Sequence, residues 1–329
     1  MKLLNSTKSL VADTAILEAI KTIQERFPKK ILGVYVTGSY ANGYAVSTSD
    51  LDLYFVFDEN LSKENEKLGE EINRQLENIT PALDIAFRGL PSLLEMGEVG
   101  MRENYLHVFG EPVHLQIPSP SMEDYIYRRM HSGYLRMQLT RKTKPYTWPM
   151  DFPDDSGSLK GYDWREKISH NGKQFNSIKE IVVLTGWMAT GLIAWKGNTY
   201  VPTKNHVVNL FKSFFDGPIA TDFETTTEFC RTKLAYMAPD NKEDRQKLEA
   251  LLPQVLKFEN FFLENYQHFL IENLENTNPI RVRTSIIRLG EILYPNDLSL
   301  KALNNFATNN SSNKDVIEKS ISQLVVERN

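Results

Sequence analysis

The stretch from Val36 to Phe57, VTGSYANGYAVSTSDLDLYFVF, decides the fold of this chain. Its second half has the β-branched and aromatic residues of a buried strand, yet it carries two aspartates, Asp50 and Asp52. Because side chains alternate along a strand, both carboxylates project from one face, and Leu51 and Leu53 project from the other. Two carboxylates on one face repel each other, so the pattern predicts a cation between them.

A third acid lies inside another predicted strand, PALDIAFRG, from Pro81 to Gly89. If this strand lies beside DLDLYFVF, Asp84 converges with Asp50 and Asp52. Carboxylate oxygens are the ligands that Mg²⁺ prefers. Three such groups can hold two Mg²⁺ ions about 3.5–4 Å apart for in-line phosphoryl chemistry. The sequence therefore predicts a magnesium site at Asp50, Asp52 and Asp84.

The turn TGSYANG, from Thr37 to Gly43, precedes the aspartates and supplies features of a phosphate site. Gly38 ends the first predicted strand and allows the backbone to turn tightly. Ser39 offers a hydroxyl that can cap a following helix, whose first N–H groups can bind phosphate. Ser49 lies next to Asp50 and offers a second hydroxyl for phosphate or metal. We expect a phosphate cradle followed by metal ligands.

The order strand, Gly-Ser, spacer, Asp-x-Asp, helix and strand with Asp resembles the signature of the DNA polymerase β-like nucleotidyltransferase superfamily. It is most similar to the small bacterial members with a helical C-terminal domain, the aminoglycoside adenylyltransferases of the streptomycin/spectinomycin type. The resemblance implies an α+β fold: a small mixed-sheet nucleotidyltransferase domain at residues 1–120, then a mostly α-helical domain at 121–329 that closes over substrate and nucleotide. The boundary falls in PSPS, at 118–121.

The resemblance extends more weakly into the helical part. The segment AWKGNTYVPTK places a phosphate-contacting lysine at Lys204, and LAYMAPDNKEDR places a nucleotide-contacting tyrosine at Tyr236. Two departures stand out. The relatives carry a phosphate-binding arginine about one helix length before the lysine, where this chain reads GWMATGLIAW. Their third carboxylate is often a glutamate that acts as a base, so Asp84 is predicted as either metal ligand or general base.

Apolar periodicity predicts the remaining elements. In the first part we expect helices at 13–27, with Asp13 as N-cap, and at 62–79, strands at 31–38 and 50–57, and a short strand within 106–117. In the second part we expect helices at 122–142, 174–195, 204–215, 222–236 and 242–274, an irregular insertion at 143–164, a further helical layer, and a polar tail at 309–329.

Composition and charge indicate a soluble globular protein. The chain has 329 residues and a net charge of −4, which argues against broad binding of nucleic acid or anionic membranes but leaves a local basic groove open. A single cysteine, Cys230, forms no internal disulfide. No secretory signal is recognisable, and the most apolar segment, 181–195, is shorter than the roughly 20 residues of a membrane span. We expect a cytoplasmic protein.

The predicted reaction is Mg²⁺-dependent transfer of a nucleoside monophosphate, AMP from ATP in the first instance, onto a hydroxyl of a small molecule, with release of pyrophosphate. An aminoglycoside-like compound is the leading acceptor, as in antibiotic-resistance enzymes. Acids among aromatic residues in the insertion fit a polycationic acceptor, or else they belong to a solvated surface loop: Asp151, Asp154, Asp155 and Asp163 among Phe152, Tyr162 and Trp164.

Two other functions stay open at this point. One is nucleotidyl transfer to a macromolecule, a tRNA end or a protein side chain, as in toxin or antitoxin enzymes. The other is an inactive nucleotide-binding homologue, against which the intact Gly38, Ser39 and three aspartates argue. The sequence leaves open the acceptor, the choice between ATP and other triphosphates, and whether the protein is a monomer or a homodimer.

Overall fold

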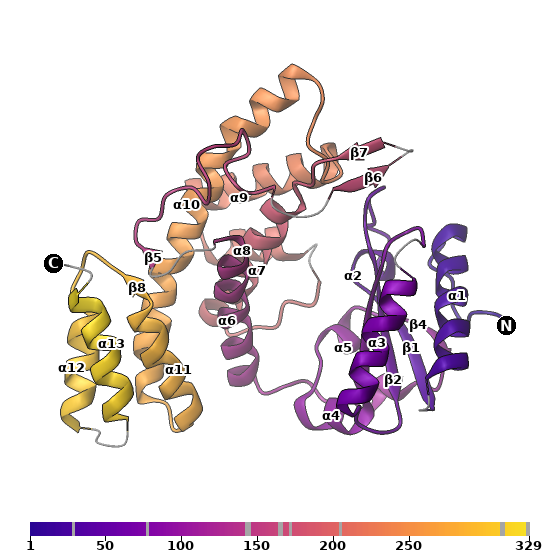
Figure 1. The fold of residues 1–329 in the computed structure, drawn as a ribbon, viewed down its shortest axis with the longest axis horizontal. Coiled ribbons are helices and arrows are strands. Elements are labelled where there is room, and N and C mark those ends of the chain that lie inside the picture. Colours follow the sequence, from indigo (N-terminus) through magenta and orange to yellow (C-terminus); the bar gives the residue numbers. More distant parts are fainter. Residues whose placement is uncertain are drawn as a thin grey trace.

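The computed structural model describes residues 1–27, 30–76, 79–141, 146–163, 167–170, 173–203, 206–309 and 313–326. The chain forms a small α+β part at its N-terminus and a larger helical part beside it (Figure 1). This arrangement confirms the predicted fold class. No helix within the described ranges combines the length and the apolarity needed to cross a membrane.

A mixed four-stranded sheet forms the centre of the N-terminal part. Its order is β3-β2-β1-β4, in which β2 and β3 run parallel and the other neighbours run antiparallel. The strands are β1 (Ile31–Thr37), β2 (Leu51–Phe57), β3 (Leu83–Gly89) and β4 (Leu106–Gly110). Alternate residues of β2 are fully buried on one face, as the apolar pattern predicts: Leu51, Leu53, Phe55 and Phe57.

Two helices cover that buried face, α1 (Leu10–Arg26) and α3 (Lys63–Gln75). The first helix begins earlier than predicted, because the side chain of Ser9, not of Asp13, accepts the hydrogen bond from the backbone N–H of Ala12. The Asp13 carboxylate instead accepts hydrogen bonds from Ser6 and Thr7, before the helix. Ser62 and Asn65 form a capping box at the start of α3.

Short elements partly cover the opposite face of the sheet. They are α4 (Leu90–Met96), α5 (Gly100–Glu103) and the 3₁₀ turn η1 (Val113–Leu115), which pack on a small core around Tyr35 and Val56. The remainder of this face, where Asp52 and Asp84 lie, is turned toward the helical part. The fold therefore leaves one end of the sheet available for a site.

The helical part is built around α7 (Lys179–Gly197), of which ten residues are buried. The apolar stretch 181–195 thus lies in a protein core. The other helices are α6 (Met122–Thr140), α8 (His206–Phe214), α9 (Pro218–Thr227), the π-helix η2 (Glu228–Lys233), α10 (Lys242–Glu272), the 3₁₀ turn η3 (Asn273–Glu275), α11 (Pro279–Gly290), α12 (Leu298–Asn309) and α13 (Lys314–Val326).

Three predictions about the helical part were wrong in detail. The predicted polar tail contains α13, because Ile317 and Leu324 are apolar residues that are buried next to α11. The helix predicted from residue 174 begins at Lys179, since a short hairpin of β6 (Ile168–His170) and β7 (Lys173–Phe175) precedes it. The helix predicted at 222–236 is split between α9 and η2.

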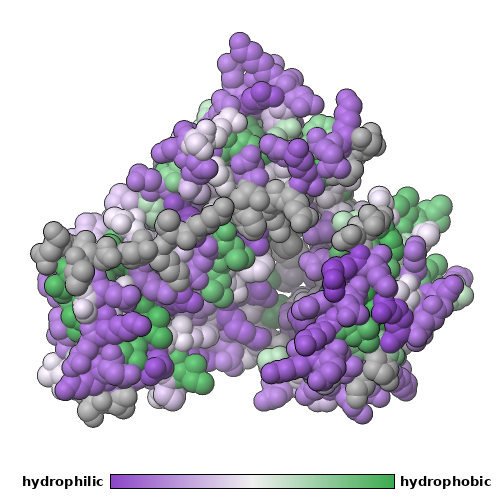
Figure 2. All heavy atoms as spheres, viewed as in Figure 1, coloured by the Kyte–Doolittle hydropathy of each residue, from purple (hydrophilic) through white to green (hydrophobic). Residues whose placement is uncertain are grey.

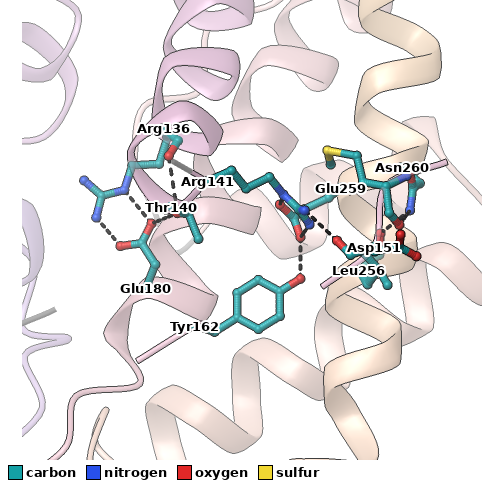
Figure 3. Close-up of polar contacts among 10 residues, drawn as sticks. Arg136, Thr140, Arg141, Asp151, Tyr162, Glu180, Leu256, Glu259 and Asn260 are labelled. Carbon is teal, nitrogen blue, oxygen red and sulfur yellow. Dashed lines mark hydrogen bonds and ion pairs between the residues drawn. The ribbon is translucent and has the colours of Figure 1, made fainter. Parts of the chain in front are cut away.

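The described part of the insertion, 146–163, packs on the helical core. Tyr146 and Thr147 form β5, which pairs with β8 (Ile292–Leu293). The phenol of Tyr162 is fully buried and donates a hydrogen bond to the Glu259 carboxylate, which also takes two hydrogen bonds from Arg141 (Figure 3). The insertion is therefore anchored to α10 and is not a freely solvated loop, although Asp151, Asp154 and Asp155 are exposed.

Candidate active site

The three carboxylates converge where the parallel strands β2 and β3 begin. Asp52 and Asp84 are direct neighbours in the register of the two strands, and Asp50 comes just before β2. One carboxylate oxygen from each residue lies within 4.8 Å of the others. Asp50 and Asp52 are half-buried and Asp84 is exposed. Three like charges held this close require a cation or a proton among them.

Two constraints select glycine at position 38, the backbone conformation and the proximity of the Asp52 carboxylate. Its φ angle is +66°, and a Cβ atom at this position would lie 1.9 Å from Asp52 Oδ2. Only glycine fits both constraints. The four-residue helix α2 (Gly38–Ala41) follows, with Thr37 at its N-cap position and no side-chain capping bond. Ser39 lies inside this helix and does not cap it, so that expectation was wrong, although Ser39 does line the cavity described below.

Ser49 is buried in the turn that leads into β2. Its backbone N–H donates to the carbonyl of Val46, and its hydroxyl accepts a hydrogen bond of 2.9 Å from the Val46 N–H. This closed turn fixes the approach of the chain to Asp50. The predicted contact of Ser49 with phosphate or metal stays a prediction.

The helical part brings a lysine to the carboxylates. Lys179, at the start of α7, places Nζ 2.6 Å from Asp50 Oδ2, and the two side chains are 18% and 33% exposed. The same Nζ lies 6.0 Å from the centre of the Tyr236 ring. The sequence analysis did not select Lys179, because nothing in the local pattern SIKEI marks a functional lysine.

Tyr236 is part of the backbone structure that positions Lys179. Ala235 and Tyr236 both have positive φ angles, +46° and +65°, directly after the π-helix η2. The Tyr236 carbonyl accepts a hydrogen bond of 2.9 Å from the N–H of Ile178, one residue before Lys179. Burial is the main cause that raises the pKa of Tyr236, so its hydroxyl stays protonated at neutral pH. Strained backbone of this kind often occurs at functional sites.

Two further hydrogen bonds join the halves beside this point. Thr48 Oγ1 donates to the carbonyl of Ala235, and Arg231 Nη2 donates to the carbonyl of Tyr44 at 3.0 Å. The turn that precedes Asp50 is therefore held directly against η2. This contact places Arg231 at the rim of the space above the carboxylates.

A cavity of about 430 Å³ lies between the two parts, within the range of about 300–1,000 Å³ that is usual for small-molecule sites. Figure 2 shows the surface hollowed between them. The sheet side of the lining includes Gly38, Ser39, Ser49, Asp50, Asp52, Tyr54, Asp84, Arg88 and Glu98, and the helical side includes Arg129, Lys179, Gly186, Trp187, Arg231 and Tyr236.

Several predicted residues thus meet in one cavity: the three carboxylates, Gly38, Ser39, Ser49 and Tyr236. Lys204 lies outside the described residues. Asp151, Asp154, Asp155 and Asp163 are absent from the described lining of this cavity, so the structure gives no support to them as acceptor ligands. Lys179, Arg129 and Arg231 reach the cavity from α7, α6 and η2 but were not among the predicted site residues.

The resembled relatives carry a phosphate-binding arginine in the segment where this chain reads GWMATGLIAW, and other cations of this chain lie near that position. Gly186 stands in the segment GWMATGLIAW and lines the cavity, and no heavy atom lies within 4 Å of where its Cβ would be. A side chain at this position would point into open space. Among the described lining residues, Lys179 and Arg231 supply positive charge on the same side of the cavity.

The carboxylate set fits divalent magnesium. All three donors are hard oxygen atoms, they come from rigid strands or their ends, and their spacing allows two of them to share an ion after a small adjustment. Lys179 already places one positive charge at Asp50, which neutralises part of the charge of the three carboxylates. Binding of a metal ion to that oxygen requires the ammonium group to move away.

Comparison with known proteins agrees with this geometry. Residues 16–90 match the family model described as a nucleotidyltransferase domain, and this range contains the Gly38 turn and all three carboxylates. The match confirms the resemblance drawn from the motif and the predicted enzyme class, a nucleotidyltransferase. No curated protein matches the chain.

Among solved structures, a spectinomycin adenyltransferase from Enterococcus faecialis, determined with ATP and spectinomycin, is similar at 9% identity and a TM-score of 0.45. The similarity covers 75% of this chain and 98% of that chain. We draw no conclusion about substrate from it.

Proposed function

We propose that this protein transfers a nucleoside monophosphate, AMP from ATP as the first candidate, to a hydroxyl of a small molecule and releases pyrophosphate, with Mg²⁺ as cofactor. The observation that carries the proposal is the convergence of Asp50, Asp52 and Asp84 beside the Gly38 turn in a cavity shared by both parts of the chain. We retain the domain boundary at residues 118–121 as part of this proposal.

The carboxylates hold the metal and orient the reaction. Asp50 and Asp52 would hold Mg²⁺, and Asp84 would either complete a second metal site or take the proton of the attacking hydroxyl. When bound, Mg²⁺ neutralises charge on the triphosphate and polarises the α-phosphate. The strand pairing between Asp52 and Asp84 fixes these groups rigidly, as positioning and electrostatic stabilisation require.

The bond changes follow from this arrangement. The acceptor oxygen forms a bond to the α-phosphorus as the bond between that phosphorus and the oxygen bridging to the β-phosphate breaks. Pyrophosphate leaves with the bonding electrons. The acceptor proton passes to Asp84, or to solvent if Asp84 is a metal ligand. No oxidant or reductant takes part.

The remaining site residues bind the triphosphate. Gly38 and Ser39 line the cavity beside the carboxylates, and the backbone and hydroxyl of this turn bind phosphate oxygens. Lys179 exchanges its contact with Asp50 for a contact with phosphate when metal and nucleotide bind, and Arg231 adds charge at the rim. Tyr236 holds this edge in place, and Ser49 and Lys204 remain as further predicted contacts. The cavity volume favours a small acceptor, of which aminoglycoside-like compounds are the first class to screen.

The test is a label-transfer screen. The purified protein is incubated with Mg²⁺ and each triphosphate labelled at the α-phosphate, then with aminoglycosides, other hydroxyl compounds, tRNA, or no addition. We expect label on a small molecule from one preferred triphosphate. Asp52→Asn should lower transfer at least about 100-fold, the size of one lost electrostatic contact in a transition state.

The control is Asp58→Asn, an exposed aspartate directly after β2 that is not part of the cavity lining. It should transfer label at the wild-type rate, and neither variant should melt below the wild-type temperature. Label found on tRNA or on the protein itself, and never on a small molecule, would support the macromolecular alternative. Full activity of Asp52→Asn at the usual Mg²⁺ concentration would disprove the metal site.

A further inference from the structure

The charged groups that line the cavity are separated along the sheet. Asp84, Ala86 and Arg88 alternate on β3 with Ile85 and Phe87, which pack against the core on the other face, so the first three side chains share the face that lines the cavity. At about 3.3 Å per residue, Arg88 lies roughly 13 Å from Asp84 along the strand. The cavity therefore extends from the carboxylates to a second end, at Arg88.

The second end gathers charge around Tyr54. Arg88 Cζ lies 5.7 Å from the centre of the Tyr54 ring, and Arg129 reaches the same cavity from α6. Glu98 lines the cavity together with Tyr54, Arg88 and Arg129. Glu98 also accepts a hydrogen bond of 3.1 Å from the Gly100 N–H.

The balance of charge at this end is positive. Glu98 is the one acid among the described lining residues outside the metal cluster, whereas the same lining contains Arg88 and Arg129. Within the described chain, neither Arg88 nor Arg129 lies within 4.0 Å of a carboxylate oxygen. Once metal ions neutralise the three aspartates, a polycationic acceptor meets two guanidinium groups and a single carboxylate.

We propose that Arg88 and Arg129 form an anion subsite for the acceptor, which is a small hydroxyl compound that carries a carboxylate or phosphate group. Guanidinium groups bind both anions through paired hydrogen bonds. Trp187, on α7, is 41% exposed and lines the same cavity, so its indole ring offers a flat surface for the body of the acceptor. This inference rests on the proposed function and replaces aminoglycoside-like compounds with anionic ones as its leading acceptor class.

The experiment measures acceptor binding without knowing the natural compound. The protein is loaded with Mg²⁺ and α,β-methylene ATP, which cannot transfer its nucleotide, and is titrated calorimetrically with three matched sets of probes. The anionic set is glucose 6-phosphate, glucuronate and 3-phosphoglycerate, the neutral set is glucose and glycerol, and the polycationic set is kanamycin and spectinomycin. We expect the tightest binding from a member of the anionic set.

The variants Arg88→Met and Arg129→Met should each weaken that binding at least 10-fold and leave nucleotide binding unchanged. Arg128→Met is the matched control, because Arg128 is the exposed neighbour of Arg129 on α6, does not belong to the cavity lining, and donates to the Met96 carbonyl. It should bind the probe as the wild type does.

The outcomes distinguish this inference from the proposed function. Tighter binding of a polycation, no binding of any anionic probe, or wild-type affinity for the anionic probe in both arginine variants overturns the anion subsite while nucleotide binding stays intact. A wild-type protein that fails to bind the Mg²⁺–nucleotide complex overturns the proposed function itself, and the subsite with it.

Discussion

Two groups of charged residues in this molecule differ in how their charges are satisfied. In the helical part, Glu180 and Glu259 are completely buried, and each receives two hydrogen bonds from an arginine, Arg136 or Arg141. Thr140 donates a further hydrogen bond to Glu180, and Tyr162 donates one to Glu259 (Figure 3). In the cavity, by contrast, three carboxylates lie within 4.8 Å of one another.

The difference separates structural charge from functional charge. A buried pair with every hydrogen bond made has no capacity left for a ligand, and its removal is felt as lost stability. Like charges gathered on partly exposed strand ends reduce stability, and they are worth keeping only if a ligand neutralises them. The comparison therefore predicts that substitutions in the two groups have opposite effects on folding and on activity.

The largest effect on stability is expected from Glu259→Gln. This change leaves the Arg141 guanidinium buried without its counter-ion, which costs about 3–5 kcal/mol. Chemical denaturation followed by tryptophan fluorescence measures the loss. Glu264→Gln, an exposed position on the same helix α10, is the control and should change stability by less than about 0.5 kcal/mol. Wild-type stability of Glu259→Gln would show that the buried pair is not structural.

A second test uses pH on the structural side of the comparison. Burial, and then the positive charge of Arg288, lowers the pKa of His131 from 6.5 to about 4, and the Tyr266 hydroxyl lies 2.6 Å from its Nδ1 atom. Between these values the unfolded chain binds more protons than the folded one. Stability is therefore complete above about pH 6.5 and falls by roughly 3 kcal/mol as the pH drops to about 4.

Unfolding in urea at a series of pH values between 6.5 and 4 checks this dependence. In His131→Asn the fall in stability with pH should be smaller by that amount, because the titrating group is gone. His268→Asn removes an exposed histidine from α10 and should keep the wild-type slope. If stability falls equally with pH in His131→Asn and His268→Asn, then His131 does not cause the pH dependence.

The two groups also differ in how far the sequence reveals them. The aspartates lie in one motif, where strand alternation and the spacing to Asp84 suffice to predict a shared face. Glu259 and Arg141 are 118 positions apart, so only the packing of α6 against α10 brings them together. Lys179 is an intermediate case, since its helix was predicted but its contact with Asp50 depends on how the two parts of the chain meet.

The same limit explains the errors at element ends. The start of α1 depends on which of two nearby polar residues, Ser9 or Asp13, accepts the capping bond, and their local sequences do not decide it. The C-terminal α13 reads as polar in sequence because it buries only a narrow apolar stripe, with Ile317 and Leu324. Tertiary contacts determine both where α1 begins and that α13 forms a helix.

The smallest effect is expected where the two groups of charges meet, at Lys179. Its ion pair with Asp50 is partly exposed, so Lys179→Met should change stability by no more than about 1 kcal/mol. Loss of the ammonium removes a competitor for the Asp50 oxygen, and Mn²⁺ should bind the nucleotide-free variant more tightly in calorimetry. Loss of a phosphate contact should raise the KM for the triphosphate about 10-fold, which corresponds to about 1.4 kcal/mol.

Lys212→Met is the matched control for this prediction. Lys212 forms an exposed ion pair with Glu224, 2.9 Å long, and is not part of the described cavity lining. It should leave both the affinity for Mn²⁺ and the KM unchanged. If Lys179→Met instead loses several kcal/mol of stability and keeps its KM, then the Lys179–Asp50 pair is a structural link between the two parts. In that case the Lys179–Asp50 pair would contribute to stability as the buried pairs of the helical core do, and the distinction between structural and functional charge would not hold at this position.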